Sequence, residues 1–386
     1  MPEITQNAGG CHVVIDIINY LVINGYSANM LFEKRYKYKE AMLFSPIHWT
    51  YQSKFNARQI VSTIWISVFR IYSLIKKNKI PLINFIQGYE NYFENGAVYN
   101  SVALTHKMAD EELVVSQYLQ NKIKKNFDFD TTLIPTGINY DLIAHRNTNK
   151  KVKNITFVMR NNPMKGDYIL SDIIKQLDNK FSGLSFTVIY MSKEIEIPSV
   201  RNNSLEKIIG PTTRLDLIGI LNKTDVYVDA SVNEGFGLIG LEAMASGAVP
   251  VMSDSFGVRE YLHDRKNGYL VKRVNDSDEY VSKIGELIQN PNRFQKMKDQ
   301  GFTDTKSFDY DNRITEYIQF FSKERRYFEK QFIKEEKRLI SERSYSPSDT
   351  TPKGMSIIKI FNMFLPKIIR KTLKKTISWL YSLYEK

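Results

Sequence analysis

The sequence predicts an α/β protein built from two similar domains, each a parallel sheet covered by helices on both faces. Apolar, strand-like runs alternate with segments of helical length through most of the 386 residues, and this order of elements is typical of parallel sheets. A polar stretch at 144–154, AHRNTNKKVKN, interrupts the alternation before a fresh strand begins, as a linker between domains would. We therefore expect an N-terminal domain over residues 1–147 and a C-terminal domain over 148–307.

The strand predictions rest on short apolar runs. In the N-terminal domain these are ANMLFE (28–33), PLINFIQ (81–87), EELVVSQ (111–117) and TTLIPTG (131–137). In the C-terminal domain they are NITFVMR (154–160), SFTVIYM (185–191), LEKIIG (205–210), DVYVDAS (225–231) and AVPVMSD (248–254). The longest apolar run, 60–75, contains Arg70 and is shorter than the ~20 residues of a membrane span, so we expect a packed helix there.

The two ends of the chain depart from this pattern. The chain opens on a glycine-containing loop with almost nothing before it; either Met1 is not the true start or the first strand is missing, and we expect an incomplete N-terminal sheet. At the other end we expect helices over 308–343, the first of them crossing back to the N-terminal domain, and a Ser/Pro/Thr linker at 344–354. Residues 355–386 set apolar side chains at helical spacing against lysines, with Pro366 dividing two basic amphipathic helices.

Composition restricts the class of protein. The chain is 42% hydrophobic and 25% charged, as ordinary globular proteins are. Its net charge is +12, but residues 353–386 hold eight bases and one acid and so carry +7 of it. A general nucleic-acid-binding surface is therefore not expected. The single cysteine, Cys11, and the absence of a signal-peptide pattern favour a reducing cytoplasm.

GFGLIG (235–240) spells G-x-G-x-x-G after a predicted strand, and the next strand ends in Asp254. An NAD-dependent enzyme is one interpretation of this pattern. Glu234, directly before the motif, would however repel a pyrophosphate. A nucleotide sugar removes that conflict, because carboxylates accept hydrogen bonds from sugar hydroxyls while the amides around Gly237 and Leu238 face phosphate.

Positive charge for such a ligand lies at NITFVMRNNPMKGDYIL, where a predicted strand ends in Arg160 and a loop leads through Lys165 and Gly166 into a helix. Two cations at the carboxyl end of the domain's first strand suit a diphosphate leaving group. Taken alone, they could equally be ordinary surface charges on a loop.

Together these segments resemble the retaining glycosyltransferases of family 4, which have the two-domain GT-B fold. The family's E-x7-E motif matches Glu234 to Glu242, and its R-x4-K-G pattern matches the segment above, with Met159 in place of the usual preceding glycine. LIPTGIN (133–139) is similar to the interdomain segment of the family and AGG (8–10) to its N-terminal glycine loop. GVREYLHDRKNGYLV is similar to the turn after the donor site, and the resemblance covers roughly residues 5 to 322.

The resemblance implies two Rossmann-like domains that face each other across a cleft, with a nucleotide-sugar donor between them and transfer with retention. Arg160 and Lys165 would stabilise the leaving diphosphate, Glu234 would hold the donor sugar and Glu242 the ribose. The other donor contacts that it implies are Gly9, Gly10, Gly235, Phe236, Gly237 and Leu238. No enzymic nucleophile, cofactor or metal is then required.

FIQGYENYF (85–93) resembles a rhamnosyltransferase-like branch of the family, which reads Q-D-Y-E at this place; Gly88 replaces the aspartate. Gln87 and Glu90 are the acceptor-side candidates, and the alternative is that they merely end a strand. The metal-binding spelling D-x-D occurs at 128–130 and 309–311 without a suitable strand before it, and the five histidines are scattered, so no metal site is expected.

The basic tail, 353–386, is expected to lie on an anionic membrane surface, the alternative being a helix docked on protein. The function predicted from the sequence is a cytoplasmic, membrane-associated glycosyltransferase. It would transfer a sugar to a lipid-linked glycan acceptor in bacterial surface polysaccharide synthesis. The alternatives are an NAD-dependent enzyme and a catalytically inactive GT-B binding protein.

Overall fold

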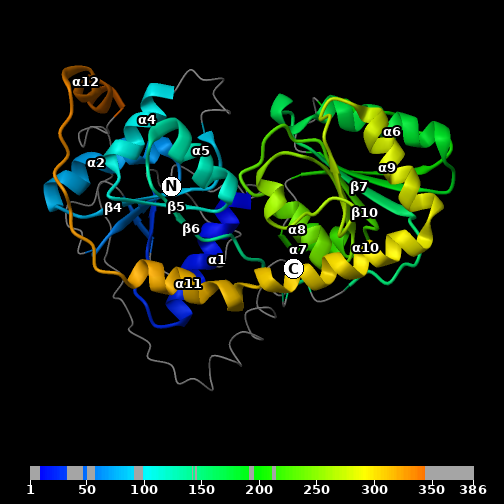
Figure 1. Cartoon of the computed structure of the whole chain (residues 1–386), viewed down its shortest axis with the longest axis horizontal. Coiled ribbons are helices and arrows are strands. Elements are labelled where there is room, and N and C mark those ends of the chain that lie inside the picture. Colours follow the sequence, from blue (N-terminus) through cyan, green and yellow to red (C-terminus); the bar gives the residue numbers. More distant parts are fainter. Residues whose placement is uncertain are drawn as a thin grey trace, which may run out of the picture. The chain divides into compact units, whose positions relative to one another are not determined.

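The computed structural model describes residues 9–32, 47–49, 57–90, 99–140, 142–143, 146–190, 195–210 and 214–343 (Figure 1). These residues form two compact units. The first runs to Ile134 and resumes over 313–343, and the second is Pro135–Asn312. The predicted linker 344–354 and basic helices 355–386 lie outside the described residues.

The division between the units falls inside LIPTGIN rather than at the predicted boundary, 147/148. Ile138 is part of the second unit because its backbone N–H donates to Phe308 at 2.8 Å and its carbonyl accepts from Tyr310 at 3.0 Å. Gly137 packs so closely there that a Cβ atom would lie 2.9 Å from the Tyr310 ring.

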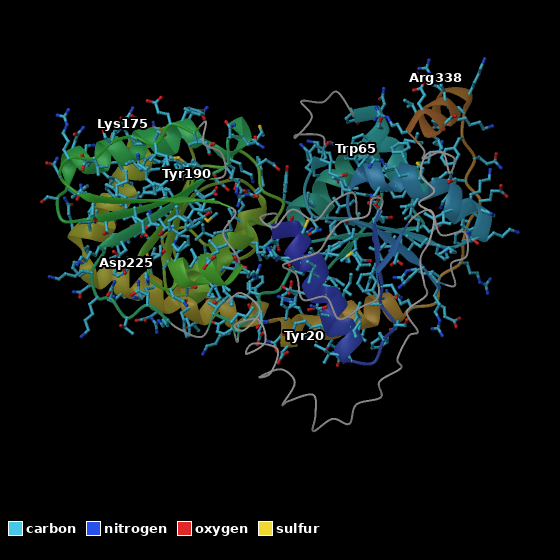
Figure 2. All side chains as sticks on the ribbon, turned by 180° about the vertical axis from the view of Figure 1, so that it is seen from behind. Tyr20, Trp65, Lys175, Tyr190, Asp225 and Arg338 are labelled. Atoms are coloured by element: carbon cyan, nitrogen blue, oxygen red, sulfur yellow. The ribbon has the colours of Figure 1, made fainter. Side chains whose placement is uncertain are left out.

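Four residues of the polar stretch interpreted as a linker bond to Asp225 of the second unit, which Figure 2 labels. The buried Asp225 carboxylate accepts from the backbone N–H groups of Lys153 and Asn154 at 2.9 and 2.8 Å. It also accepts from the side-chain amides of Asn147 and Asn149, at 2.6 and 3.0 Å. Asn147 and Asn149 of this stretch are thus held by hydrogen bonds to a buried acid.

The second unit is a six-stranded, fully parallel sheet in the order β12-β11-β10-β7-β8-β9. Its strands are β7 (Asn154–Met159), β8 (Ser185–Tyr190), β9 (Ser204–Ile209), β10 (Val226–Asp229), β11 (Val249–Ser253) and β12 (Tyr269–Val271). Its helices are α6 (Asp167–Lys180), α7 (Arg214–Leu221), α8 (Leu238–Ala245), α9 (Ser277–Gln289) and α10 (Pro291–Asp304), with 3-10 turns η1 (Pro163–Lys165), η2 (Gly257–Glu260) and η3 (Thr305–Phe308).

Helices cover both faces of this sheet, α6 and α9 on one and α8 and α10 on the other (Figure 1). The central strands read as continuous apolar runs because both faces are buried. Ile155, Phe157, Val226 and Val228, for example, are fully buried. All five strands predicted here are confirmed, and β12 is an addition.

The first unit holds a four-stranded parallel sheet, β3-β4-β5-β6, and a separate parallel pair, β1-β2. Its strands are β1 (Met30–Phe32), β2 (Ile47–Trp49), β3 (Ile60–Ser62), β4 (Leu82–Ile86), β5 (Glu111–Val114) and β6 (Thr132–Leu133). Its helices are α1 (Gly9–Ile23), α2 (Trp65–Asn78), α4 (Tyr99–Met108) and α5 (Gln117–Phe127), and later α11 (Tyr310–Ser322), which begins in the second unit, and α12 (Lys334–Arg343).

Two predictions for the first unit need correction. The apolar run 60–75 is not one helix, because its first three residues form β3, which pairs with β4. The segment 308–343 is not helical throughout, because 323–333 between α11 and α12 has no regular structure. Arg325 fixes this segment by bonds to Glu111 and to the side-chain oxygen of Gln59, and α12 packs on α2.

No helix within the described ranges combines the length and apolar character that crossing a bilayer demands.

Candidate active site

The candidate site lies where two neighbouring strands of the second unit end. From β7 the chain proceeds to β8 and β9 on one side, then returns through β10 to β11 and β12 on the other. Ligands of open α/β sheets bind at such a reversal, beside the carboxyl ends of the strands. Here those ends lead directly into Arg160 after β7 and, five residues past the end of β10, into Glu234.

The loop after β7 is fixed by the first residue of the helix that follows it. The Asp167 carboxylate accepts from the backbone N–H of Arg160 at 3.1 and 3.2 Å and from that of Asn162 at 3.3 Å. The Asn162 side chain in turn accepts from the N–H of Met164 at 2.9 Å. These bonds hold the loop in one conformation between the two predicted cations.

Gly166 allows this loop to lie against the loop after β10. Its φ is +68°, and a Cβ atom would overlap the carbonyl oxygen of Ala230. A backbone bond of 2.8 Å from Val232 to Met164 joins the two loops. The glycine of the R-x4-K-G pattern is thus required by close approach of backbone as well as by its φ.

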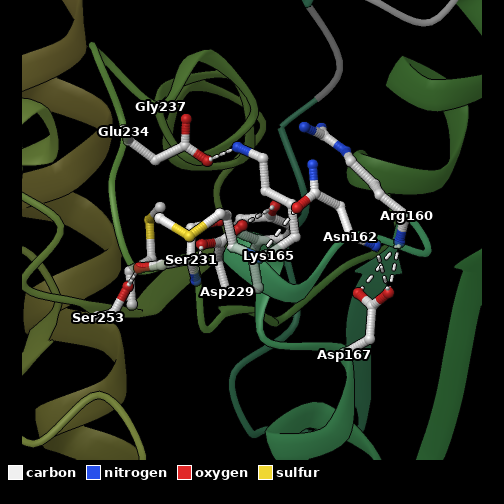
Figure 3. A network of polar contacts seen from close by, with 12 residues as sticks. Arg160, Asn162, Lys165, Asp167, Asp229, Ser231, Glu234, Gly237 and Ser253 are labelled. Atoms are coloured by element: carbon white, nitrogen blue, oxygen red, sulfur yellow. Dashed lines mark hydrogen bonds and ion pairs between the residues drawn. The ribbon is translucent and has the colours of Figure 1, made fainter. Parts of the chain in front are cut away.

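An ion pair joins the two loops at their tips (Figure 3). The Lys165 Nζ lies 2.5 Å from the Glu234 Oε1, and the two side chains are 11% and 17% exposed. Burial acts to raise the pKa of Glu234, but the charges of Lys165 and Arg160 outweigh it and hold that pKa below its usual value. Glu234 is therefore a carboxylate stabilised by the charges of two cations.

A second carboxyl group, Asp229, shares this site and was not predicted. Its oxygens accept from the Ser231 N–H at 2.9 Å and from the Tyr227 hydroxyl at 3.3 Å. Burial, then the charge of Glu234, raises the pKa of Asp229 against the opposing effect of Lys165. An acid that ends an apolar strand is the signal that would have revealed it.

The residues after Glu234 form the start of α8. Gly237 precedes the helix with φ +83°, and its carbonyl accepts from the Tyr261 hydroxyl at 2.6 Å. Leu238 is the first helical residue, so the free amides of this end are available to an anion. The Phe236 side chain is buried between the rings of Tyr261 and Phe308 at 5.6 and 6.0 Å, so the predicted donor contact of this residue stays a prediction for its backbone. Only the backbone of Gly235 and Phe236 is left to face a ligand.

Glu242 lies on α8 with its side chain 2% exposed, paired at 2.5 Å with the Arg214 guanidinium. Burial raises the pKa of Glu242, and Arg214 offsets part of that effect. No pattern in the sequence indicated Arg214, since the two residues belong to different helices.

Three of the four candidates in the first unit, Gly9, Gly10 and Gln87, lie together. Gly9 and Gly10 begin α1, and a Cβ atom at Gly10 would lie 3.2 Å from the side-chain oxygen of Gln87. Glu90 does not join them. Its carboxylate accepts from the backbone N–H of Trp65 at 2.8 and 3.1 Å and so caps the start of α2. Burial raises the pKa of Glu90 to about 8.

Within the part of the chain that the structure describes, no three His, Cys, Asp or Glu side chains gather as metal ligands would. In the D-x-D at 128–130, both aspartates instead pair with Lys124, at 2.9 and 3.0 Å.

Comparison with known proteins shows what this arrangement is similar to. Residues 141–304 match the model of the glycosyl transferases group 1. The matched residues lie within the second unit, which is therefore similar to this family. An uncharacterized glycosyltransferase of Methanocaldococcus jannaschii is 29% identical over 251 residues, which are 64% of this chain and 67% of that protein. The phosphatidyl-myo-inositol mannosyltransferase of Mycobacterium leprae is 26% identical, over 42% of this chain and 45% of its own.

Solved structures give the fold of the whole chain. HepE of Anabaena, in complex with UDP and glucose, superimposes with a TM-score of 0.68 at 14% identity, over 83% of this chain and 98% of its own. A sucrose-phosphate synthase from Thermosynechococcus elongatus gives 0.65 at 15% identity, over 81% and 93%. The fold is therefore GT-B, and the second unit carries the Lys165–Glu234 pair.

Replacing Gly166 by Ala tests the close approach of the two loops. We expect a loss of about 3 kcal/mol in the free energy of unfolding, because the methyl group meets the Ala230 carbonyl and φ stays positive. Gly183→Ala is the matched control, since Gly183 has φ +76° with no atom within 4 Å of a Cβ; it should cost about 1 kcal/mol. Equal losses of unfolding free energy in denaturant titrations of the two variants would contradict the close contact between Gly166 and Ala230.

Glu90→Gln tests the buried carboxyl group. With a pKa of about 8, Glu90 keeps its proton in the folded chain at pH values where it has lost it in the unfolded chain, above about pH 4.5. The free energy of unfolding therefore falls as the pH rises between these two values. The variant should therefore match the wild type in thermal unfolding at pH 4 and unfold at a higher temperature at pH 8.5. Glu324→Gln, at an exposed position, should show no such divergence; parallel pH profiles for Glu90→Gln would refute the assignment.

Proposed function

We propose that the protein is a retaining glycosyltransferase that moves a sugar from a nucleoside-diphosphate donor to a glycan acceptor. The observation that carries the proposal is the buried pair of Lys165 and Glu234, with Arg160 beside it, at the sheet's topological reversal and in front of α8. The match of residues 141–304 to the group 1 family, which includes GFGLIG, supports it.

The chemistry required is the departure of a diphosphate from an anomeric carbon. As that carbon–oxygen bond breaks, negative charge grows on the leaving phosphate, and the fixed charges of Lys165 and Arg160 stabilise it. The amides that open α8 add hydrogen-bond donors for phosphate. The acceptor hydroxyl attacks from the same face, and its proton passes to the leaving phosphate oxygen, so no enzymic nucleophile takes part.

Glu234 and Glu242 serve the neutral parts of the donor in this proposal. A diphosphate that binds Lys165 takes the place of the Glu234 carboxylate, which is then free to accept from sugar hydroxyls. Glu242, held by Arg214, would accept from the ribose. Gly9 and Gly10 would approach the donor from the first unit, and Gln87 would lie on the acceptor side, with no cofactor or metal involved.

The acceptor and the setting are further parts of the proposal. We propose a lipid-linked acceptor at the inner face of the cell membrane and a role in bacterial surface polysaccharide synthesis, with a hexose or a deoxyhexose such as rhamnose transferred. The related mannosyltransferase is named for a phosphatidyl lipid, which supports a lipid acceptor. HepE was crystallised with UDP and glucose, which makes UDP-sugars the first donors to test.

Lys165→Ala should lower nucleotide-sugar turnover by about 10²–10³-fold, since a cation at the leaving group is lost. The assay is release of free nucleotide from a panel of nucleotide sugars, with lipid-linked acceptor present. Lys175→Ala, on the exposed face of α6 (Figure 2), should retain full activity. Unchanged turnover in Lys165→Ala would refute the assignment, and stabilisation of both chains by NAD would favour the dinucleotide alternative.

Deleting residues 353–386 should move the protein from the pellet to the supernatant when it is sedimented with anionic liposomes. The seven net positive charges of this segment attract anionic lipid, and each is worth about 1 kcal/mol near such a surface. Neutral liposomes are the control. A truncated chain that still sediments would show that the segment is not the anchor.

A further inference from the structure

The backbone at Phe256 adopts a conformation that a side chain disfavours. Its φ is 68° and its ψ is −70°, and the Gly257 N–H donates to the Ser255 carbonyl at 3.0 Å across it. This is a three-residue γ-turn of the positive-φ form, which is rare and strained. A glycine would adopt it freely, yet the position holds a phenylalanine.

The strained turn is clamped to the loop that carries Glu234. The Glu234 N–H donates to the Ser255 carbonyl at 3.0 Å, and the Gly257 N–H donates to the Glu234 carbonyl at 3.1 Å. A Cβ atom at Gly257 would overlap the Gly235 carbonyl. The turn therefore lies directly against the residue proposed to hold the donor sugar, and strain retained at such a place indicates function.

The ring of Phe256 is also exposed where the rest of the second unit buries its apolar side chains. Phe256 is 37% exposed. Among the described residues of this unit, the other exposed large apolar residues are Tyr168 and Val232. Tyr168 follows Asp167 on α6, and Val232 donates its N–H to the loop of Lys165. All three lie at the carboxyl edge of the sheet, around the candidate site.

A neighbouring cation holds the ring in place. The Arg259 guanidinium lies 5.8 Å from the ring centroid, and Asp254 holds that guanidinium with two bonds of 2.5 and 2.6 Å. Phe256 is 37% exposed despite this cation–π contact.

We propose that Phe256 determines sugar specificity by packing its ring against the C–H face of a pyranose held at Glu234. The C–H bonds on one face of a pyranose carry partial positive charge and meet the negative face of an aromatic ring favourably, while the hydroxyl groups of the same sugar bond to the carboxylate. The inference rests on the proposed function, and the pyranose belongs either to the donor or to the acceptor.

The test is Phe256→Gly in the full chain, with Phe256→Tyr to restore the ring. The glycine variant relieves the γ-turn, so its ligand-free Tm should rise by about 3 °C. We expect unchanged affinity for UDP, or for the nucleotide of whichever sugar donor stabilises the wild type. Affinity for the pyranose should fall by roughly tenfold, and the tyrosine variant should recover it.

Calorimetric titration with nucleotide and with nucleotide sugar separates the two sources. A loss confined to the nucleotide sugar assigns the ring to the donor pyranose, and a raised KM for acceptor with donor affinity unchanged assigns it to the acceptor. Arg265→Gly is the matched control, because it relieves a φ of 63° at the turn before β12, on the opposite edge of the sheet. It should raise Tm and leave both affinities unchanged.

Wild-type affinities for donor and acceptor in Phe256→Gly would overturn this inference and leave the proposed function intact. An equal loss for nucleotide and nucleotide sugar would also overturn it, since the ring would then act through the loop and not on a sugar. If the wild type itself binds no nucleotide sugar, the proposed function fails and the inference falls with it.

Discussion

The candidate site depends on one buried ion pair, Lys165 with Glu234. Without the cation, the charge of Glu234 would act unopposed on Asp229, whose pKa burial and that charge already raise. Breaking such a pair costs more than forming it gains, because a lone buried charge is left behind. The rigid loop after β7, the positive φ of Gly166 and the Val232–Met164 bond all serve to bring that ammonium to that carboxylate.

Much of this arrangement could be predicted from local pattern. The nine expected strands occur, and the central ones of the second unit could be predicted because continuous apolar runs mark buried parallel strands. The two motifs predicted that Arg160, Lys165 and Glu234 lie on neighbouring loops, because each motif follows a strand of the same sheet. β3 was missed because its apolar residues continue without a break into α2. The domain boundary differs from the predicted one because Asn147 and Asn149 bond to Asp225, a partner distant in sequence, and so belong to the second unit.

The aromatic residues show where pattern stops being informative. Phe236 lies inside the motif and was expected at the donor, but its ring is buried in the domain core. Phe256 lies outside the motif and is exposed beside Glu234, because a γ-turn directs it there. The hydrophobic pattern of a sequence does not indicate where a residue other than glycine adopts a positive φ, as Phe256 does. Arg214 was missed for a related reason, since its pairing with Glu242 is set by how α7 and α8 pack.

In the proposed function, the same ion pair restricts which ligands the second unit can accept. Lys165 already has a carboxylate at 2.5 Å, so a neutral ligand gains little by approaching it. A diphosphate carries more charge than the carboxylate and offers several oxygens, so it can displace Glu234 and leave that group to sugar hydroxyls. Exchange of partners thus couples recognition of the phosphates to recognition of the sugar. A free sugar would meet a Glu234 carboxylate that is already paired with Lys165. This pairing favours a sugar nucleotide over a free sugar as the ligand.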